Sequence, residues 1–218
     1  MSKSVTKLVP SVGSRRSSHS STKRRLIAVA TDLFTEHGYA AASLDAIVAG
    51  AEVTKGALYH HYSGKQALFE AVFINTEAES AESIRKALTG HRDPWQKAQA
   101  GLRAFLEVIQ DPTYRRVVIQ DGPAVLGFER YREQEERSAY AHVVDIVRDV
   151  LHAGGADDLD EEMVQTFARI FFGALSSAGE TVASAEDPQT AAARVEAAIT
   201  FILSGFQALA AQEAALEQ

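Results

Sequence analysis

The residues of this chain that are best suited to chemistry lie in one short segment near the N-terminus. Projected at about 100° per residue, a helix over residues 55–62 places Leu58 and Tyr62 on one face. The remaining surface combines small residues with side chains that form hydrogen bonds: Lys55, Gly56, Ala57, Tyr59, His60 and His61. Small residues allow a close backbone approach, and the polar side chains can reach phosphates or base edges. The segment is therefore a candidate surface for a groove of double-stranded DNA.

Two helix N-termini add anion-binding groups to this segment. Thr54 is a capping residue directly before the helix, and Ser63 and Gln66 have the spacing of a capping box that opens the next helix. The free backbone N–H groups of a helix N-terminus attract phosphate. We therefore expect Thr54 and Lys65 to belong to the same interface.

Helices and a tight turn must position these side chains. From Thr22 onward, apolar residues fall on one helix face: Ile27, Ala30, Leu33 and Phe34. Gly38 favours a left-handed end to that helix, and Ser43 is expected to cap a second helix over residues 44–51. A turn at residues 52–53 then joins the two short helices, which have the proportions of a helix-turn-helix.

The charge is distributed as expected for a protein that meets a polyanion at one end only. The net charge is −7, but residues 1–72 carry nine Lys/Arg and five Asp/Glu, whereas residues 73–218 carry 13 and 24. Residues 1–21 are rich in Ser, Lys and Arg and are expected to form a flexible basic tail, followed by Arg24 and Arg25. Such a tail either lies along DNA or only improves solubility, and both roles stay open.

The remainder of the chain is also expected to be helical. Three Asp-Pro pairs, which begin at Asp93, Asp111 and Asp187, each place a capping acid before a proline suited to a first helical turn. No segment shows sustained β alternation with hairpin turns. We expect an all-α fold of about nine helices without a sheet. Its expected parts are a tail (1–21), a DNA-binding domain (22–72) and a helical effector-binding and dimerisation domain (73–218).

Several classes of protein are disfavoured by what the sequence lacks. There are no cysteines, which excludes disulfides and thiol catalysis and fits a reducing cytoplasm. No stretch approaches the roughly 18 apolar residues of a membrane span, and no apolar region follows the N-terminal lysines, so no membrane association is expected. The usual motifs of nucleophilic, zinc-dependent and nucleotide-binding enzymes are missing. His60 and His61 are adjacent and diverge on a helix, so neither a metal site nor a cofactor is expected.

The stretch over residues 25–72 closely resembles the DNA-binding domain of the TetR family of transcriptional regulators. The motif LFTEHGY at residues 33–39 resembles the end of the family's first helix, and VTKGALYHHYSGKQALF at residues 53–69 resembles its recognition helix. The resemblance runs without a gap over nearly 50 residues, under a quarter of the chain. DGPAVLG at residues 121–127 is similar to a segment of some members.

The resemblance implies a repressor that binds a palindromic operator as a homodimer. It assigns DNA contacts to these positions: Ser43, Thr54, Lys55, Gly56, Ala57, Tyr59, His60, His61 and Lys65. Lys65 matches the family's phosphate-clamping lysine, and Ser43 matches a phosphate contact at the start of the second helix. Ala57 departs from the threonine of many members, which puts one polar contact in doubt and leaves room for a thymine methyl group.

The resemblance also implies a homodimer interface and a small-molecule effector. The last two long helices have apolar stripes that serve either as internal core or as the dimer interface, and the interface is favoured. The residues of that expected interface are Phe167, Phe171, Ala174, Leu175, Ala178, Ile199, Ile202 and Phe206. Candidate pocket residues are Trp95, Phe105, Gln120, Phe128, Tyr131, Tyr140 and His142, and simple core packing stays open for each aromatic residue. The fourth helix, residues 64–88, joins the two domains and would couple effector binding to DNA binding.

Other functions remain compatible with the sequence. An enzyme would convert a substrate, and no motif in the sequence suggests one. A structural nucleic-acid protein would bind every sequence alike, without a response to a ligand, and an activator would bind DNA in the same way as a repressor. The sequence identifies neither the effector nor the operator and its genes.

Overall fold

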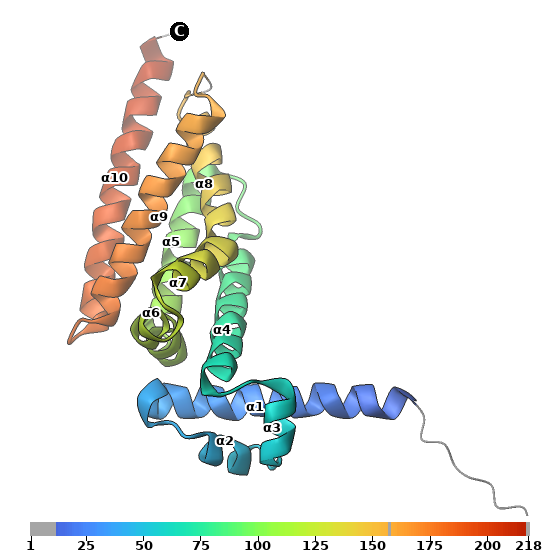
Figure 1. Cartoon of the computed structure of the whole chain (residues 1–218). Coiled ribbons are helices and arrows are strands. Elements are labelled where there is room, and N and C mark those ends of the chain that lie inside the picture. The colour runs from blue at the N-terminus through green and yellow to red at the C-terminus, as the bar shows by residue number, and fades with distance from the viewer. Residues whose placement is uncertain (1–11, 157, 217–218) are drawn as a thin grey trace, which may run out of the picture. The chain divides into compact units, whose positions relative to one another are not determined.

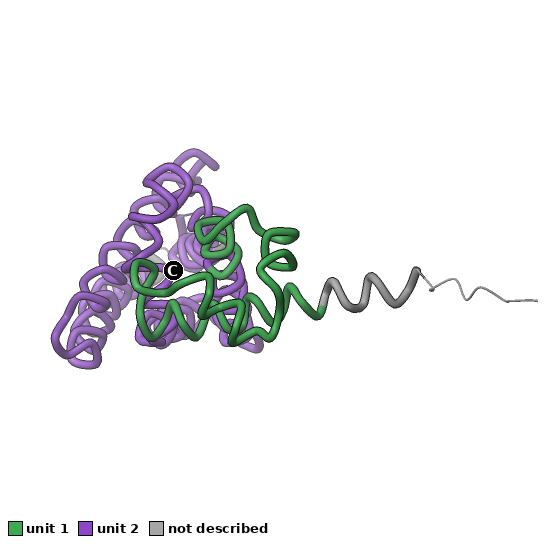
Figure 2. The backbone as a smooth tube through the Cα atoms, turned by 60° about the horizontal axis from the view of Figure 1, so that its bottom comes forward, with its two compact units in different colours: residues 1–72 green, residues 73–218 purple. Residues whose placement is uncertain are grey.

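The computed structural model describes residues 12–156 and 158–216, which contain ten α-helices, two π-helical segments and no strand (Figure 1). The predicted all-α class is therefore confirmed for the described residues, with one α-helix more than expected. The chain divides into two compact units, Met1–Val72 and Phe73–Gln218 (Figure 2).

Helix α1 (Val12–Ala41) begins ten residues before the expected start at Thr22. Residues 12–21 are thus helical, contrary to the expectation of a flexible tail, while residues 1–11 of that tail lie outside the described residues. A segment joined to a formed helix can extend it without the cost of a new nucleus, so even a polar run can be helical. Gly38 interrupts α1 with a φ of 74°, which is the predicted left-handed end.

The core of unit 1 lies between α1, α2 (Leu44–Gly50), α3 (Lys55–His61) and the start of α4 (Lys65–Leu88). The side chains with no exposed surface there are Leu26, Ala30, Phe34, Ile47, Leu58, Leu68, Phe69 and Val72. The rings of Phe34 and Phe69 meet edge to face, with centroids 5.2 Å apart. This core fixes the orientation of α3 relative to α1 and α2.

The turn between α2 and α3 is tight because one residue adopts a left-handed conformation. Glu52 has a φ of 52°, and the N–H of Val53 donates to the carbonyl oxygen of Val48 at 3.1 Å. This six-residue hydrogen bond is the pattern of a Schellman helix end, a position usually taken by glycine. Gly50 permits a close packing of α2, since a Cβ there would lie 2.8 Å from Cγ1 of Val29 in α1.

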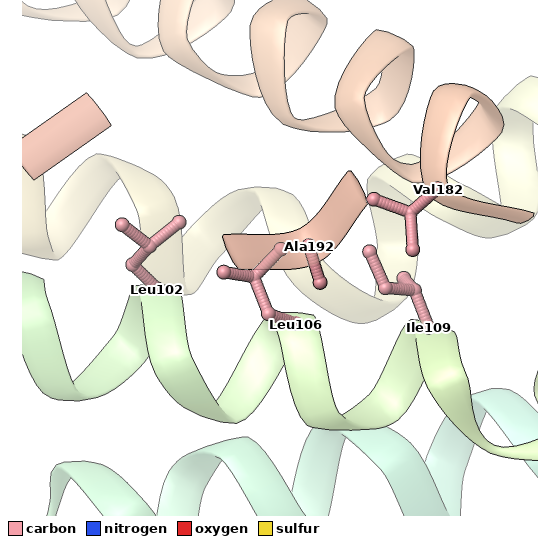
Figure 3. Close-up of a cluster of buried hydrophobic side chains, with 5 residues drawn as sticks. All are labelled: Leu102, Leu106, Ile109, Val182 and Ala192. Carbon is pink, nitrogen blue, oxygen red and sulfur yellow. The ribbon is translucent and has the colours of Figure 1, made fainter. Parts of the chain in front are cut away.

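Unit 2 is organised around α5 (Pro94–Gln110), which packs against α8 (Ala141–Ala153), α9 (Glu161–Ala183) and α10 (Pro188–Leu216). One apolar cluster joins three of these helices: Leu102, Leu106, Ile109, Val182 and Ala192 (Figure 3). A second cluster joins α8 to α9: Val144, Val147, Leu151, Val164 and Ala168. Helix α4 contributes residues 65–72 to unit 1 and residues 73–88 to unit 2.

The predicted Asp-Pro caps are present. The Asp93 side chain accepts a hydrogen bond from the N–H of Gln96 at 2.8 Å at the start of α5, and Asp187 caps α10 in the same way. Asp111 caps the next helical stretch, which contains the π-helical segment η1 (Tyr114–Asp121). The chain then continues through α6 (Gly122–Leu126), α7 (Phe128–Glu135) and a second π-helical segment, η2 (Glu136–Tyr140).

Helix α10 corrects one expectation from the sequence. Residues Pro188–Gln212 are long and apolar enough to cross a membrane, with a mean hydropathy of 1.3, although no such segment was anticipated. Arg194 and Glu196 interrupt the run, so the sequence contains no unbroken apolar stretch of this length. Glu196 accepts a hydrogen bond from Arg103 of α5 at 2.8 Å, so this part of α10 is joined to the helices of unit 2 by a polar contact.

Candidate nucleic-acid interface and ligand cavity

Helix α3 presents the face that its sequence predicted. Leu58 is fully buried and Tyr62, directly after the helix, is 7% exposed, so both belong to the core of unit 1. Tyr59 is 57% exposed, and Lys55, Gly56 and His60 are exposed as well. Ala57 and His61 are half-buried. The outer surface of α3 is therefore polar and is lowered at Gly56, where a Cβ would meet only the Thr54 side chain.

Both predicted capping residues hold the N-termini of the two short helices. Ser43 Oγ accepts a hydrogen bond from the N–H of Ala46, and Thr54 Oγ1 accepts one from the N–H of Ala57, each at 3.1 Å. Both hydrogen bonds lie at the surface. Each cap satisfies one N–H and leaves others at that helix end to contact an anion.

Two lysines of the candidate interface already have partners in unit 1. Lys55 Nζ lies 2.7 Å from Asp45 Oδ1, and this hydrogen-bonded carboxylate raises the pKa of Lys55 above its ordinary value. Lys65 Nζ donates to the carbonyl oxygen of Ala40 at 3.1 Å and lies 4.5 Å from the centre of the Tyr39 ring. Lys65 therefore also links α4 to the end of α1, a structural role that the sequence did not indicate.

The remaining predicted DNA-binding residues are accessible. Arg24 and Arg25 are exposed on α1. The rings of His60 and His61 lie edge to face with centroids 5.5 Å apart at the C-terminal end of α3. The interface thus carries cationic groups on α1, α3 and α4, together with neutral hydrogen-bonding groups on α3.

Unit 2 contains a cavity of about 210 Å³. Helices α4, α5, α7, α8, α9 and α10 line it together with both π-helical segments, and most of the lining is apolar. Gly101 and Gly179 bring the helix backbones close to their neighbours at its wall, since a Cβ on Gly101 would lie 3.1 Å from a Leu88 methyl group. An apolar lining with a few polar groups is typical of a small-molecule site.

Polar side chains in the cavity wall come mainly from α4, η1 and α7. Tyr131 Oη donates to Glu135 Oε1 at 3.3 Å, and the Tyr114 side chain is hydrogen-bonded to Glu77. Burial raises the pKa of Tyr114 and of Tyr131 well above the ordinary value. Burial, with the nearby charge of Glu77, also raises the pKa of Glu135 to about 7. The cavity therefore combines an apolar body with a group of phenols and carboxyls.

The predicted pocket residues divide into two groups. Phe105, Tyr131 and His142 line the cavity. Trp95 and Tyr140 do not: Trp95 is buried at the start of α5, and Tyr140 packs on Phe172 and donates to the Gln165 side chain at 2.9 Å.

Two further residues predicted for the pocket lie at the surface instead. Gln120 lies in η1 and is exposed, with its side chain 3.5 Å from an Arg116 nitrogen. Phe128 follows Gly127, whose φ is 80°, and is 75% exposed. Neither residue lines the cavity.

The carboxyls of the cavity were missed in the sequence, although a signal exists for one of them. Glu77 occupies the apolar stripe of α4, four residues after Phe73 and seven before Ile84. An acid on a buried helix face is unusual, because a carboxylate loses hydration there. Glu135 and Glu180 have no comparable signal, since each has polar neighbours in the sequence.

Helices α9 and α10 expose large apolar side chains. The most exposed are Phe201 (80%), Ile170 (62%), Leu209 (62%) and Ile202 (49%). Gly173 and Gly205 leave open space on the same helices, because a Cβ there would meet nothing within 4 Å. Several large exposed apolar side chains on neighbouring helices are typical of an interaction surface.

The residues predicted for a dimer interface only partly coincide with this exposed surface. Ile202 and Phe206 are exposed, as is Ala174, while Ala178 is half-buried. Four others pack at least partly against clusters of their own unit: Phe167, Phe171, Leu175 and Ile199. The predicted stripe thus includes both inward-packed and exposed residues, whereas the most exposed apolar side chains include Ile170, Phe201 and Leu209, which were not predicted.

Family comparisons agree for both units. Residues 26–72 match the model described as "Bacterial regulatory proteins, tetR family", and residues 95–206 match "Tetracyclin repressor-like, C-terminal domain". The second match alone spans half of the chain.

Individual relatives support the same family. The crystal structure of a TetR-family transcriptional regulator from Pectobacterium atrosepticum is 30% identical, with a TM-score of 0.75, covering 88% of this chain and 96% of that one. The transcriptional activator FasR of Mycolicibacterium smegmatis is 32% identical over 51% of this chain and 53% of its own length. The regulator UidR of Escherichia coli is 30% identical over 32% of this chain and 35% of its own. The chain thus spans about half or less of the length of these two curated relatives.

Proposed function

Because the chain belongs to the TetR family of DNA-binding transcriptional regulators, we propose that it is a homodimeric repressor released from a palindromic operator by a small-molecule effector. The observation that carries the proposal is the outer face of α3, where Tyr59 and His60 are exposed beside Gly56. Polar side chains next to a lowered backbone suit the major groove. The proposed setting is the bacterial cytoplasm, where chromosomal DNA lies, and the proposed role involves no catalysis.

Phosphate contacts are proposed to fix the position of α3 in the groove. The N-terminus of α2 at Ser43 and that of α3 at Thr54 offer backbone N–H groups, and Lys55 and Lys65 offer ammonium groups. Arg24 and Arg25 extend the cationic surface along α1. Contacts of this type supply affinity and orientation, while Ala57, Tyr59, His60 and His61 would supply base recognition.

The exposed apolar surface of α9 and α10 supports the homodimer. Large side chains such as Phe201 and Leu209 lose water contact when two copies of these helices pair. A two-fold dimer presents two recognition helices, which suits successive major grooves about 34–36 Å apart on one side of DNA.

The cavity of unit 2 supports control by a ligand. Helix α4 supplies Glu77, Ala81 and Ile84 to the cavity wall, and residues 65–72 of the same helix belong to unit 1. A ligand that binds better when α4 is displaced must weaken operator binding by the same coupling free energy, typically about 1–3 kcal/mol.

Tyr59→Ala tests the proposed DNA-binding face. The side chain is 57% exposed, so its removal leaves the core of unit 1 intact. We expect operator affinity to fall about tenfold or more, because a base or phosphate contact is lost. Fluorescence anisotropy with labelled operator measures the change. Phe128→Ala, which removes another exposed aromatic side chain in unit 2, is the control. Unchanged affinity of the Tyr59 variant would refute the assignment of this face.

Activation is the second candidate, because the relative FasR is named a transcriptional activator. Both roles use the same DNA-binding face and differ in where the operator lies relative to the promoter. Transcription in vitro from the bound promoter distinguishes them: a repressor lowers transcript yield as protein is added, and an activator raises it.

A further inference from the structure

One glycine in the wall of the cavity occupies a position that costs stability. Gly179 lies in the interior of α9, where it is buried and lines the cavity of unit 2. Glycine lowers the stability of a helix interior relative to alanine, because it loses more conformational freedom on folding and has no methyl group to bury. The position therefore requires a reason, which is either the close packing of another segment or the close approach of a ligand to the backbone.

Close packing explains Gly101, the other glycine of the cavity wall, but it does not explain Gly179. A Cβ on Gly101 would lie 3.1 Å from Cδ2 of Leu88, which is too close for two carbon atoms at rest. A Cβ on Gly179 would meet Cζ of Phe105 first, at 3.5 Å, which is an ordinary van der Waals distance. Alanine would therefore fit at position 179 without displacing the atoms around it.

The space beside Gly179 is surrounded by hydrocarbon groups. After Phe105, the atoms nearest to the position of a Cβ are Cγ2 of Ile109 at 3.7 Å and Cδ1 of Ile119 at 3.9 Å. All three side chains line the cavity, and they come from α5 and η1. Because Gly179 has no side chain, the cavity extends there by a methyl-sized apolar recess against the backbone of α9.

Polar side chains elsewhere in the cavity wall are hydrogen-bonded to one another. Tyr131 donates to Glu135 at 3.3 Å, and the Tyr114 side chain is hydrogen-bonded to Glu77. A molecule in the cavity therefore does not need to supply a charge or a hydrogen bond to these groups. Apolar contact is the main interaction that the remaining wall offers.

We propose that the effector is an uncharged hydrophobic molecule whose hydrocarbon edge enters the recess at Gly179, and that this glycine determines which molecules fit the cavity. The inference rests on the proposed control of this regulator by a small molecule. It specifies the chemical class of that molecule and the residue of α9 that selects it.

Gly179→Ala separates a role in ligand binding from a role in packing, because the two roles predict opposite changes in stability. Without a ligand, we expect the Tm of unit 2, followed by the fluorescence of Trp95, to rise by about 1–4 °C, since alanine favours the helix and fills the recess. A lower Tm would mean that the glycine is needed for packing, and it would overturn the proposal.

Binding is measured with N-phenyl-1-naphthylamine, an uncharged aromatic dye whose fluorescence rises in apolar surroundings. We expect saturable binding to the full-length protein and a loss of affinity of about tenfold in Gly179→Ala, because the added methyl group occupies space that the dye uses. Gly173→Ala is the matched control on α9, since a Cβ there would meet nothing within 4 Å and the residue lies outside the cavity wall. Its affinity for the dye should equal that of the parent protein.

Three results of the binding measurement would overturn the proposal. Absence of saturable dye binding to the parent protein would contradict the hydrophobic ligand class. Unchanged affinity in Gly179→Ala would contradict the role of the recess, and an equal loss in Gly173→Ala would place the bound dye elsewhere.

The binding assay contains no DNA, so its outcome is separate from the regulator assignment. If the dye fails to bind but the operator is still recognised, the proposed ligand class is wrong and the regulator remains. If the dye binds at Gly179 and operator affinity does not change, the site exists and ligand control of DNA binding is wrong.

Discussion

Lys55 is held by Asp45 at 2.7 Å, so a DNA phosphate must compete with a carboxylate for the same ammonium group. Both side chains are more than 60% exposed, and an ion pair this exposed is weak in water. Asp45 also carries a negative charge close to the surface that DNA would approach. Asp45 is therefore expected to weaken DNA binding.

Asp45→Asn is expected to tighten operator binding by about two- to fivefold, because Lys55 is released and a repulsive charge is removed. The gain should shrink as salt is raised, since both effects are electrostatic. Anisotropy titrations at two salt concentrations measure it. Glu36→Gln, the same change of charge on α1, is the control, and an equal gain in that variant would mean that only net charge matters.

Glu135 gives the fold a pH dependence whose direction follows from its raised pKa. The carboxyl has a pKa of about 7 in the folded chain, against 4.5 as its ordinary value. Between these pH values the folded state binds the proton more strongly than the unfolded state, so stability falls as pH rises through this window. This loss of folding stability is complete above about pH 7 and absent below about pH 4.5.

Glu135→Gln should remove the fall in folding stability that occurs as the pH rises. We expect the variant to be more stable than the parent protein by about 1–2 kcal/mol at about pH 8, after allowance for partial solvent exposure, with little difference near pH 4.5. Urea unfolding followed by the fluorescence of Trp95, which lies in unit 2, measures the difference. An equal gain at both pH values would indicate a packing effect instead.

At the scale of elements, the turn between α2 and α3 carries a local cost. Glu52 has a φ of 52°, a conformation that an L-residue with a side chain disfavours. The cost is offset by the core of unit 1, which requires α3 to leave α2 at this angle. The turn is thus a position where the sequence is not optimal for stability.

Glu52→Gly is expected to stabilise unit 1 by about 0.5–1 kcal/mol, since glycine adopts positive φ without strain. Circular dichroism records the unfolding of both units, whereas Trp95 fluorescence records unit 2, so a shift seen only in circular dichroism belongs to unit 1. Gly50→Val is the opposing variant and should destabilise unit 1, because its Cβ would crowd Val29. A Glu52→Gly variant that is less stable than the parent protein would contradict the inferred backbone strain at Glu52.

The elements that sequence could predict are those fixed by local chemistry. Ser43, Thr54, Asp93 and Asp187 cap helices as expected, because a cap depends on residues three positions away. The π-helical segments were not predicted, since their sequences resemble ordinary helices. The left-handed residue Glu52 was also missed, because only the packing of two helices imposes it.

The α3 face and the cavity of unit 2 also differ in how far the sequence could predict them. The face of α3 is a short, regular pattern, so its exposure could be projected from Leu58 and Tyr62. The cavity combines residues from segments far apart in the chain, such as Glu77 and Glu180, and no local pattern brings them together. Its carboxyls therefore appeared only in the structure.

At the scale of the whole molecule, α10 presents an apolar surface that a single chain leaves in water. Large apolar side chains of this helix are exposed, among them Phe201 at 80% and Leu209 at 62%. Pairing of α9 and α10 with a second copy would remove Phe201 and its neighbours from water, at roughly 25 cal/mol for each Å² buried. We expect the dimer to be the functional form.

Phe201→Glu should convert the protein to a monomer and abolish tight operator binding, because one copy can hold only one half-site. The side chain is 80% exposed, so the fold of each chain is expected to survive. Sedimentation velocity measures the oligomeric state. Phe128→Glu is the matched control at 75% exposure in unit 2, outside α9 and α10. A dimeric Phe201 variant would place the interface elsewhere.

Recognition of an operator by α3 is tested most sharply by sequencing the genomic DNA fragments that the purified protein retains, in parallel with those retained by the Tyr59→Ala variant. We expect the parent protein to enrich one palindrome whose half-sites lie about one helical turn, or a multiple of it, apart. The Tyr59→Ala variant should fail to enrich it. Fragments without a shared sequence, or the same palindrome retained by the variant, would contradict the assignment of α3 as the element that recognises the operator.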